Sequence, residues 1–158
     1  MGISNHSIFL LEDGTVRTVG GNYFGQCGTG NTTERQLSLY TIPDLNNVKQ
    51  VACGENHTVF LLEDGTVKTV GFNRYGQCGT GNTTERQLSL YTIPDLNNVK
   101  QIACGLYHSV FLLEDGTVRT VGYNVHGQCG TGETSLQLSL YTIPNLNNVR
   151  SLWDIIVK

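Results

Sequence analysis

Apolar and polar residues form short runs along this chain, and the same runs return three times with an offset of 51 residues. In the middle copy, apolar side chains occupy both alternating positions of residues 57–62, which predicts a strand covered on both faces. The runs at residues 48–53 and 66–71 are β-prone because they are rich in Val and Thr. A further run at residues 89–93 stops at Pro94. The pattern therefore predicts four short strands in each copy.

Turn signals separate these predicted strands. The second and third are joined by Glu63-Asp64-Gly65-Thr66, a hairpin sequence in which Asp-Gly favours positive φ angles. A Gly-rich loop separates the third strand from the fourth, and residues 95–98 turn the chain into the next copy. Four antiparallel strands per copy, with each sheet covered by its neighbours, are typical of a propeller blade. We therefore expect an all-β propeller, which the two-sided burial favours over the alternative of a solenoid.

The copies are nearly identical to one another. Residues 6–51 and 57–102 agree at 39 of 46 aligned positions. A period of roughly 40–50 residues is typical of solenoids, propellers and repeat arrays. We interpret the chain as a single repeat domain, residues 1–158, with three blade-equivalents. These comprise a blade lacking its first strand (6–45), two complete blades (48–96 and 99–146) and a last strand (147–158) that would complete a neighbour's blade.

Composition excludes several classes of protein. The chain has 39% hydrophobic residues, 15% charged residues and 19 glycines, which fits a compact, turn-rich β protein. A net charge of −3 without a basic stripe predicts no nucleic-acid partner. No apolar run reaches the roughly 18 residues of a membrane span. The first residues lack the features of a signal peptide, so we expect a cytoplasmic protein without a membrane partner.

The cysteines follow the repeat and not a metal-site spacing. They fall in Gly-Gln-Cys-Gly-Thr-Gly (Cys27, Cys78, Cys129) and in Ala-Cys-Gly (Cys53, Cys104). Their number is odd and no Cys-x-x-Cys pair occurs, which predicts buried, reduced thiols with no metal and no cofactor.

Candidate catalytic residues are equally scarce. The histidines that open the second strand of each copy (His6, His57 and His108) suit a structural hydrogen bond better than a ligand or catalytic role. The Glu-Asp pairs at the hairpin tips lack the pattern of a calcium loop. No set of nucleophile, base and orienting group can be assembled, so we predict no catalytic residue and no enzyme.

Residues 48–81 carry a family resemblance, strongest in Gly54-x-x-His57 and Gly71-x-Asn73-x-x-Gly76-Gln77. They resemble the repeat of the regulator of chromosome condensation family, and the resemblance covers nearly the whole chain. It implies a β-propeller, in that family usually a ring of about seven blades. Where the family usually has Leu, this chain has Cys27, Cys78 and Cys129. Nucleotide exchange on a small GTPase belongs to particular members, and no residue here specifically carries it.

The copies differ almost only in loops that should share one face. In an up-and-down blade, the turns after the first and third strands lie on the same face. The opposite turns are nearly constant, because the hairpin is identical in all copies and the last turn changes only from Asp95 to Asn145. The varied positions acquire aromatic and charged residues, which are favoured in recognition surfaces. They predict a partner-binding surface of Tyr23, Phe24, Glu55, Asn56, Phe72, Arg74, Tyr75, Leu106, Tyr107, Tyr123, Val125 and His126.

This surface favours a non-enzymatic binding or scaffold propeller that presents a variable loop face to a protein or glycan. Neutral drift of long loops is the alternative explanation of the variation. Two other functions stay open: a structural component of a larger assembly, such as a surface or virion decoration, and an exchange factor or enzyme acting at the propeller centre.

Three blade-equivalents also predict self-association. Known rings hold about four to eight blades, so two chains joined head to tail would make about six blades and three chains about nine. We expect a homodimer, with a trimer as the alternative. Its seam would join two groups of residues, His6, Ile8 and Leu10 of one chain and Leu152, Trp153 and Ile155 of the next.

Overall fold

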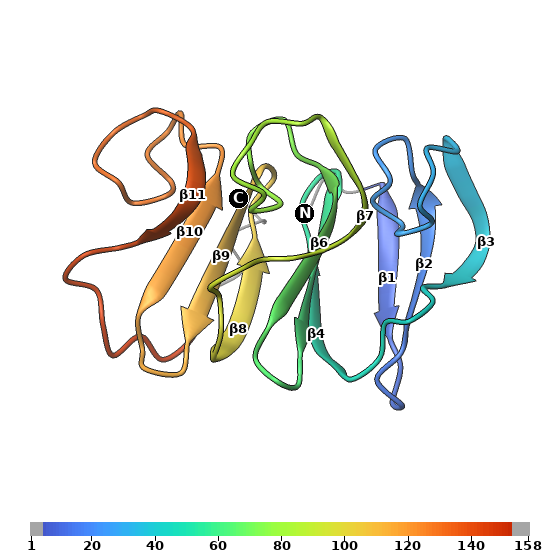
Figure 1. Cartoon of the computed structure of the whole chain (residues 1–158), viewed down its shortest axis with the longest axis horizontal. Coiled ribbons are helices and arrows are strands. Elements are labelled where there is room, and N and C mark those ends of the chain that lie inside the picture. Colours follow the sequence, from blue (N-terminus) through green and yellow to red (C-terminus); the bar gives the residue numbers. More distant parts are fainter. Residues whose placement is uncertain (1–4, 153–158) are drawn as a thin grey trace.

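The computed structural model describes residues 5–152, which form eleven strands in three separate antiparallel sheets. Figure 1 shows the sheets side by side in chain order. In this part of the chain no helix is long and apolar enough to cross a membrane. The predicted all-β class is confirmed. The strands are β1 (His6–Leu10), β2 (Val16–Gly21) and β3 (Arg35–Thr41) in the first sheet; β4 (Val48–Cys53), β5 (His57–Leu62), β6 (Val67–Phe72) and β7 (Arg86–Thr92) in the second; and β8 (Val99–Cys104), β9 (His108–Leu113), β10 (Val118–Gly122) and β11 (Gln137–Thr142) in the third.

A bulge recurs where the third strand of each four-stranded blade leads into its long loop. In the middle blade the pairing of β6 with β7 shifts between Thr69 and Gly71. Gly71 has a φ of 116°, and a Cβ there would lie 2.5 Å from the backbone oxygen of Asn56. Only glycine fits this position, because a side chain would meet both backbone strain and a clash. The bulge turns the chain out of the sheet and into the loop.

Apolar side chains fill the joints between sheets. The first joint packs Val16, Ile42 and Leu45 of the first blade against Phe60 and Val70 of the second. The second joint repeats this arrangement one blade further on, with Phe111 in the place of Phe60. Both phenylalanines are completely buried. Each sheet is thus covered on both faces wherever it has two neighbours, as the apolar pattern predicts.

A polar ladder runs through each joint beside the apolar residues. His6 Nε2 lies 2.8 Å from Thr58 Oγ1, which donates to the backbone oxygen of Gln26 at 2.8 Å. In the next joint His57 Nε2 lies 3.1 Å from Ser109 Oγ, which donates in turn to the backbone oxygen of Gln77. His6 and His57 therefore make structural hydrogen bonds between blades.

The two ends of the described chain differ from the middle. The first sheet has three strands and begins at β1. After β11, the Val149 amide donates to Gly116 O, as the Val99 amide does to Gly65 O. Gln101 holds the backbone of Leu152 at both its N–H and its carbonyl. Residues 149–152 thus follow the path of a first strand but pair in no sheet, and residues 153–158 of the predicted strand lie outside the described residues.

Candidate binding face

Aromatic rings form a continuous run across all three blades on the face that carries the long loops. We call this run the aromatic ridge; it consists of Tyr23, Phe24, Phe72, Tyr75, Tyr107, Tyr123 and His126. Phe24 of the first blade meets Phe72 of the second with 4.6 Å between ring centroids, and Tyr75 of the second meets Tyr123 of the third at 4.8 Å. Most of the pairs are edge-on, in the range where aromatic contacts are favourable. The rings therefore support one another across the joints.

Buried polar side chains hold the loop backbone beneath the ridge. Asn73 Oδ1 accepts the Cys78 amide at 2.9 Å, and its Nδ2 donates to Thr80 Oγ1 at 2.7 Å. Thr69 Oγ1 donates to the Cys78 carbonyl at 2.7 Å. The same bonds recur around Asn22 and Asn124. The motif residues therefore fix the loop shape and leave its outer side chains free to differ between copies.

Position 107 shows that this variation has a cost. In the first joint Gln26 Nε2 donates to Asn56 Oδ1 at 3.2 Å. Tyr107 stands at the corresponding position of the second joint, and within residues 5–152 the buried Gln77 Nε2 has no hydrogen-bond partner. A buried donor without a partner typically costs about 1–3 kcal/mol. The Tyr107 ring therefore joins the ridge at the cost of a hydrogen bond that Asn56 makes in the first joint.

Charged groups flank the ridge. The guanidinium of Arg86 lies 4.5 Å from the centre of the Tyr23 ring, a cation–π geometry. A hydrogen bond to the Glu55 carboxylate, together with partial burial, raises the pKa of Tyr107 to about 12. Arg74 and Glu85 form an exposed ion pair at 3.7 Å, which adds little to stability. The face thus combines aromatic surface with charges of both signs.

The structure places the predicted partner-binding residues on this face, but not all are equally accessible. Tyr23 and Val125 are about half exposed, whereas Phe72 is nearly buried at the centre of the ridge. Phe72 therefore supports the ridge from below. Glu55 and Leu106 pair through their backbones, with the Glu55 amide donating to the Leu106 oxygen. Sequence reasoning missed Arg86, because the first two copies both have arginine at this position and only contact with Tyr23 distinguishes it.

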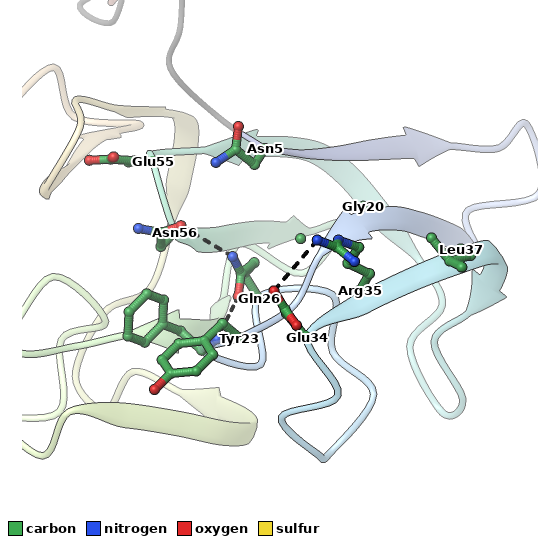
Figure 2. Close-up of a pocket in the computed structure, with 11 residues that line it drawn as sticks. Asn5, Gly20, Tyr23, Gln26, Glu34, Arg35, Leu37, Glu55 and Asn56 are labelled. Carbon is green, nitrogen blue, oxygen red and sulfur yellow. Dashed lines mark hydrogen bonds and ion pairs between the residues drawn. The ribbon is translucent and has the colours of Figure 1, made fainter.

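A groove of about 610 Å³ opens beside the first end of the ridge (Figure 2). Its walls come from the start of β1, the end of β2, the start of β3 and the turn before β5. Asn5, Gly20 and Leu37 line it, together with Gln26 and Asn56. Arg35 and Glu34 form an exposed ion pair at its rim.

The ionisable groups beneath the face are arranged for packing. Burial lowers the pKa of His57 to about 3 and those of His6 and His108 to about 4, so their rings are neutral. Burial raises the pKa of Cys78 to about 12, which disfavours a thiolate. None of the five cysteines, all of which lie within residues 5–152, forms a disulfide, and the same residues hold no metal-ligand cluster. Neutral buried imidazoles and protonated buried thiols are poor bases and nucleophiles.

Family models for the regulator of chromosome condensation (RCC1) repeat match residues 13–61 and 64–112, and again residues 48–77 and 99–128. The chain belongs to this family. It is 35% identical over 133 residues to the X-linked retinitis pigmentosa GTPase regulator homolog of Caenorhabditis elegans, covering 80% of this chain and 9% of the relative. It is 32% identical over 132 residues to the ultraviolet-B receptor UVR8 of Arabidopsis thaliana, covering 82% and 30%.

Solved structures confirm the propeller fold. Prp20p of Saccharomyces cerevisiae superposes with a TM-score of 0.82 at 21% identity, over 92% of this chain and 37% of that one. Human WBSCR16 superposes with a TM-score of 0.76 at 28% identity, over 88% and 39%. The RCC1 repeat protein therefore spans well under half the length of each of these relatives.

Proposed function

We propose that this RCC1 repeat protein is a non-enzymatic protein-binding module that recognises its partner through the aromatic ridge. One observation carries the proposal: the rings form a single supported surface across three blades at the very positions where the copies differ. Aromatic residues and arginine are enriched at protein interfaces and dominate their binding energy. The Gln77 amide beneath Tyr107, which has no hydrogen-bond partner among residues 5–152, adds support, because a residue that gives up a buried hydrogen bond is expected where its displayed ring serves another role.

The family also supports a protein partner. The crystal structure of Prp20p is described together with its binding to Gsp1p and histones. Another relative, 36% identical over 134 residues, is a probable E3 ubiquitin-protein ligase, HERC4 of Homo sapiens. This chain covers only 13% of that relative, so its name does not extend ligase activity to the matched repeats. We propose that the repeats supply binding and no catalysis.

The ridge predicts which substitutions matter. Tyr75 and Tyr107 lie at its centre and contact each other at 5.3 Å between ring centroids. Truncating a binding hot spot typically costs about 2 kcal/mol, which corresponds to about 30-fold in affinity. The Tyr75→Ala/Tyr107→Ala double variant should therefore bind the partner at least about 30-fold more weakly.

The test begins with cross-linking and mass spectrometry of the full chain in extracts, to identify the bound protein. Calorimetry then compares the unmodified chain, the double variant and a matched control, Glu63→Ala, at an exposed position on the opposite face. We expect loss of binding in the double variant alone, with folded far-ultraviolet spectra in all three. Unchanged affinity of the double variant, or equal loss in Glu63→Ala, would overturn the proposal and favour an architectural role or a site at the propeller centre. Binding to a glycan array and to no protein would contradict it as well.

A further inference from the structure

The two edges of the described structure present the separate halves of one joint. In an internal joint, the preceding blade contributes a loop glutamine, a loop glycine and a histidine. The following blade contributes a phenylalanine, an outer-strand leucine and a hydroxyl side chain. Both internal joints are built this way, so together they define what each half requires. The first blade exposes its copies of the second set, and the third blade leaves its copies of the first set only half-buried.

The apolar contacts show the mismatch in exposure most clearly. Phe60 and Phe111 are completely buried in the joints, whereas Phe9, the corresponding residue of the first blade, is 47% exposed. Leu37 is 83% exposed. On the third blade, Leu146 is 38% exposed, although its counterparts in the two internal joints are buried.

The outer-strand leucines show what Leu37 would contact. A Cβ built on Gly25 would lie 2.7 Å from Cδ2 of Leu88, and one built on Gly76 would lie 2.8 Å from Cδ2 of Leu138. These leucines therefore seat directly on the glycine of the preceding blade. A Cβ built on Gly127, the third such glycine, would meet only the Glu133 oxygen at 3.9 Å. Gly127 thus leaves open the space that Leu37 would occupy.

The polar ladder is divided in the same way. Thr58 and Ser109 are buried between a histidine and a glutamine carbonyl of the preceding blade. Ser7 has the corresponding position on the first blade and is exposed. On the third blade, His108 and Gln128 are the corresponding partners, and both are only half-buried. The geometry of the joint would bring Ser7 between them.

The groove beside β1 matches a loop of the third blade. Gln26 covers Gly71 in the first joint, with its Cβ 3.2 Å from a Cβ built on that glycine, and Gln77 covers Gly122 in the second. At Gly20, which lines the groove in Figure 2, the three atoms nearest to a built Cβ belong to the backbone of Asn5 and His6, and no loop glutamine is among them. The loop that carries Gln128 has the shape of the two covering loops, because Asn124 repeats their hydrogen bonds.

Asn5 completes the match. Gln26 donates to Asn56 in the first joint, and Asn5 is the corresponding residue of the first blade. Gln128 of a docked blade would therefore find the amide acceptor that Gln77 lacks at Tyr107. The groups in these contacts are themselves uncharged, and the nearby Arg35 and Glu34 pair with each other at the rim of the groove.

We infer that a second copy of this chain docks head to tail, with the third blade of one copy against the first blade of the other. Two such seams close a two-chain ring of about six blades, within the range of known propellers. The internal register, in which Val51 pairs with Phe60, places Leu152 of one copy beside Phe9 of the other. Residues 151 and 152 would then pair with the end of β1, at Leu10 and Phe9. Because His6 and Ile8 face the second blade within their own chain, Ser7 and Phe9 are the β1 residues that contact the seam.

Light scattering on the eluted 158-residue chain tests this inference. We expect twice the 17.3 kDa chain mass for the unmodified protein. The Leu37→Asp variant should elute at a single chain mass with an unchanged far-ultraviolet spectrum, because a carboxylate cannot seat against Gly127. The matched control Ser89→Asp adds the same charge to the exposed outer strand of the middle blade and should keep the double mass.

A second measurement guards against misfolding of the variant. Leu152→Asp changes the opposite edge, so it should also yield a single chain mass when alone. Mixed with Leu37→Asp it retains one intact seam, and the mixture should show a double-mass species. A single chain mass for the unmodified protein would overturn the inference, as would a mass of three chains or a polymer that grows with concentration.

Discussion

The loop face and the hairpin face of this RCC1 repeat protein are built from the same strands, yet they treat variation in opposite ways. At the hairpin face Asp64 Oδ1 accepts both the Thr66 amide at 3.0 Å and the Thr66 hydroxyl at 2.6 Å. The hairpins of the other two blades repeat these bonds. There the exposed side chains themselves form the hydrogen bonds that shape the turn. At the loop face, the buried side chains of Asn73 and Thr69 form the hydrogen bonds that shape the loop. The exposed side chains of the loop are therefore free to differ.

The comparison separates residues that hold a loop from residues that the loop displays. A substitution at the hairpin breaks the bonds that shape the backbone, so identity is maintained. A substitution in the ridge leaves the Asn73 bonds intact. The difference in variability therefore follows from where the loop's hydrogen-bond partners lie, and it does not depend on loop length alone.

The largest expected effect comes from removing the support beneath the loop face. Asn73→Ala removes one buried and one part-buried hydrogen bond and leaves the Cys78 amide without its acceptor. We expect the free energy of unfolding, measured with urea, to fall by about 3 kcal/mol. Thr83→Ala, on the exposed surface of the same loop, should change it by less than about 0.5 kcal/mol. A loss below about 1 kcal/mol in Asn73→Ala would show that the loop is held in another way.

An effect of intermediate size on the free energy of unfolding should appear when the pH is lowered. Both faces depend on the joints between blades, and His57 is buried in one of them. Burial holds the pKa of His57 at about 3, against about 6.5 in the unfolded chain. The unfolded chain therefore binds protons first, and stability should decrease as the pH falls below about 6.5, continuing toward the folded value. Urea unfolding between pH 7.5 and 4.5 measures this slope. His57→Gln, which cannot titrate, should show a shallower decrease, and an equal slope would assign the effect to other groups.

The smallest effect is spectroscopic and concerns the loop face itself. Because Tyr107 donates to Glu55, its pKa is raised to about 12, and its contribution to stability is present below pH 10 and lost as pH rises through about 12. Ultraviolet titration should show one tyrosine ionising later than the others. Glu55→Gln should move that pKa downward, whereas Glu63→Gln on the hairpin face should leave it unchanged. The same late ionisation in Glu55→Gln would contradict the hydrogen bond.

Sequence reasoning predicted the strands and hairpins because their signals are local. Alternation over residues 57–62 and the Asp64-Gly65 turn each act within a few residues, and the structure matches both. The sequence pattern predicted the outer strand of the middle blade at residues 89–93, whereas β7 spans Arg86–Thr92. The bulge before the loop shifts the pairing, so that Gln87 already faces Gly71. Composition gives no sign of such a shift.

The candidate site was predicted only in outline. Differences between copies located the ridge, but they could not tell displayed residues from supporting ones, because Phe72 varies and is nevertheless nearly buried. The sequence did not predict Arg86 as a site residue, because its place in the ridge depends on contact with Tyr23 in the preceding blade. Contacts between blades join residues about one repeat apart, and no local pattern records them.

The spacing of the ladder in the joints has a consequence for how such a protein changes in length. His6 bonds to Thr58 and His57 to Ser109, and in both pairs the partners are separated by 52 positions. Gln50 and Ile102 are also 52 positions apart. A tandem duplication or loss of 51 residues with its breakpoints inside residues 6–102 therefore brings one complete half of a joint against the other complete half. Genetic recombination within the array can add or remove blades without inventing a contact, so blade number is free to evolve separately from blade structure.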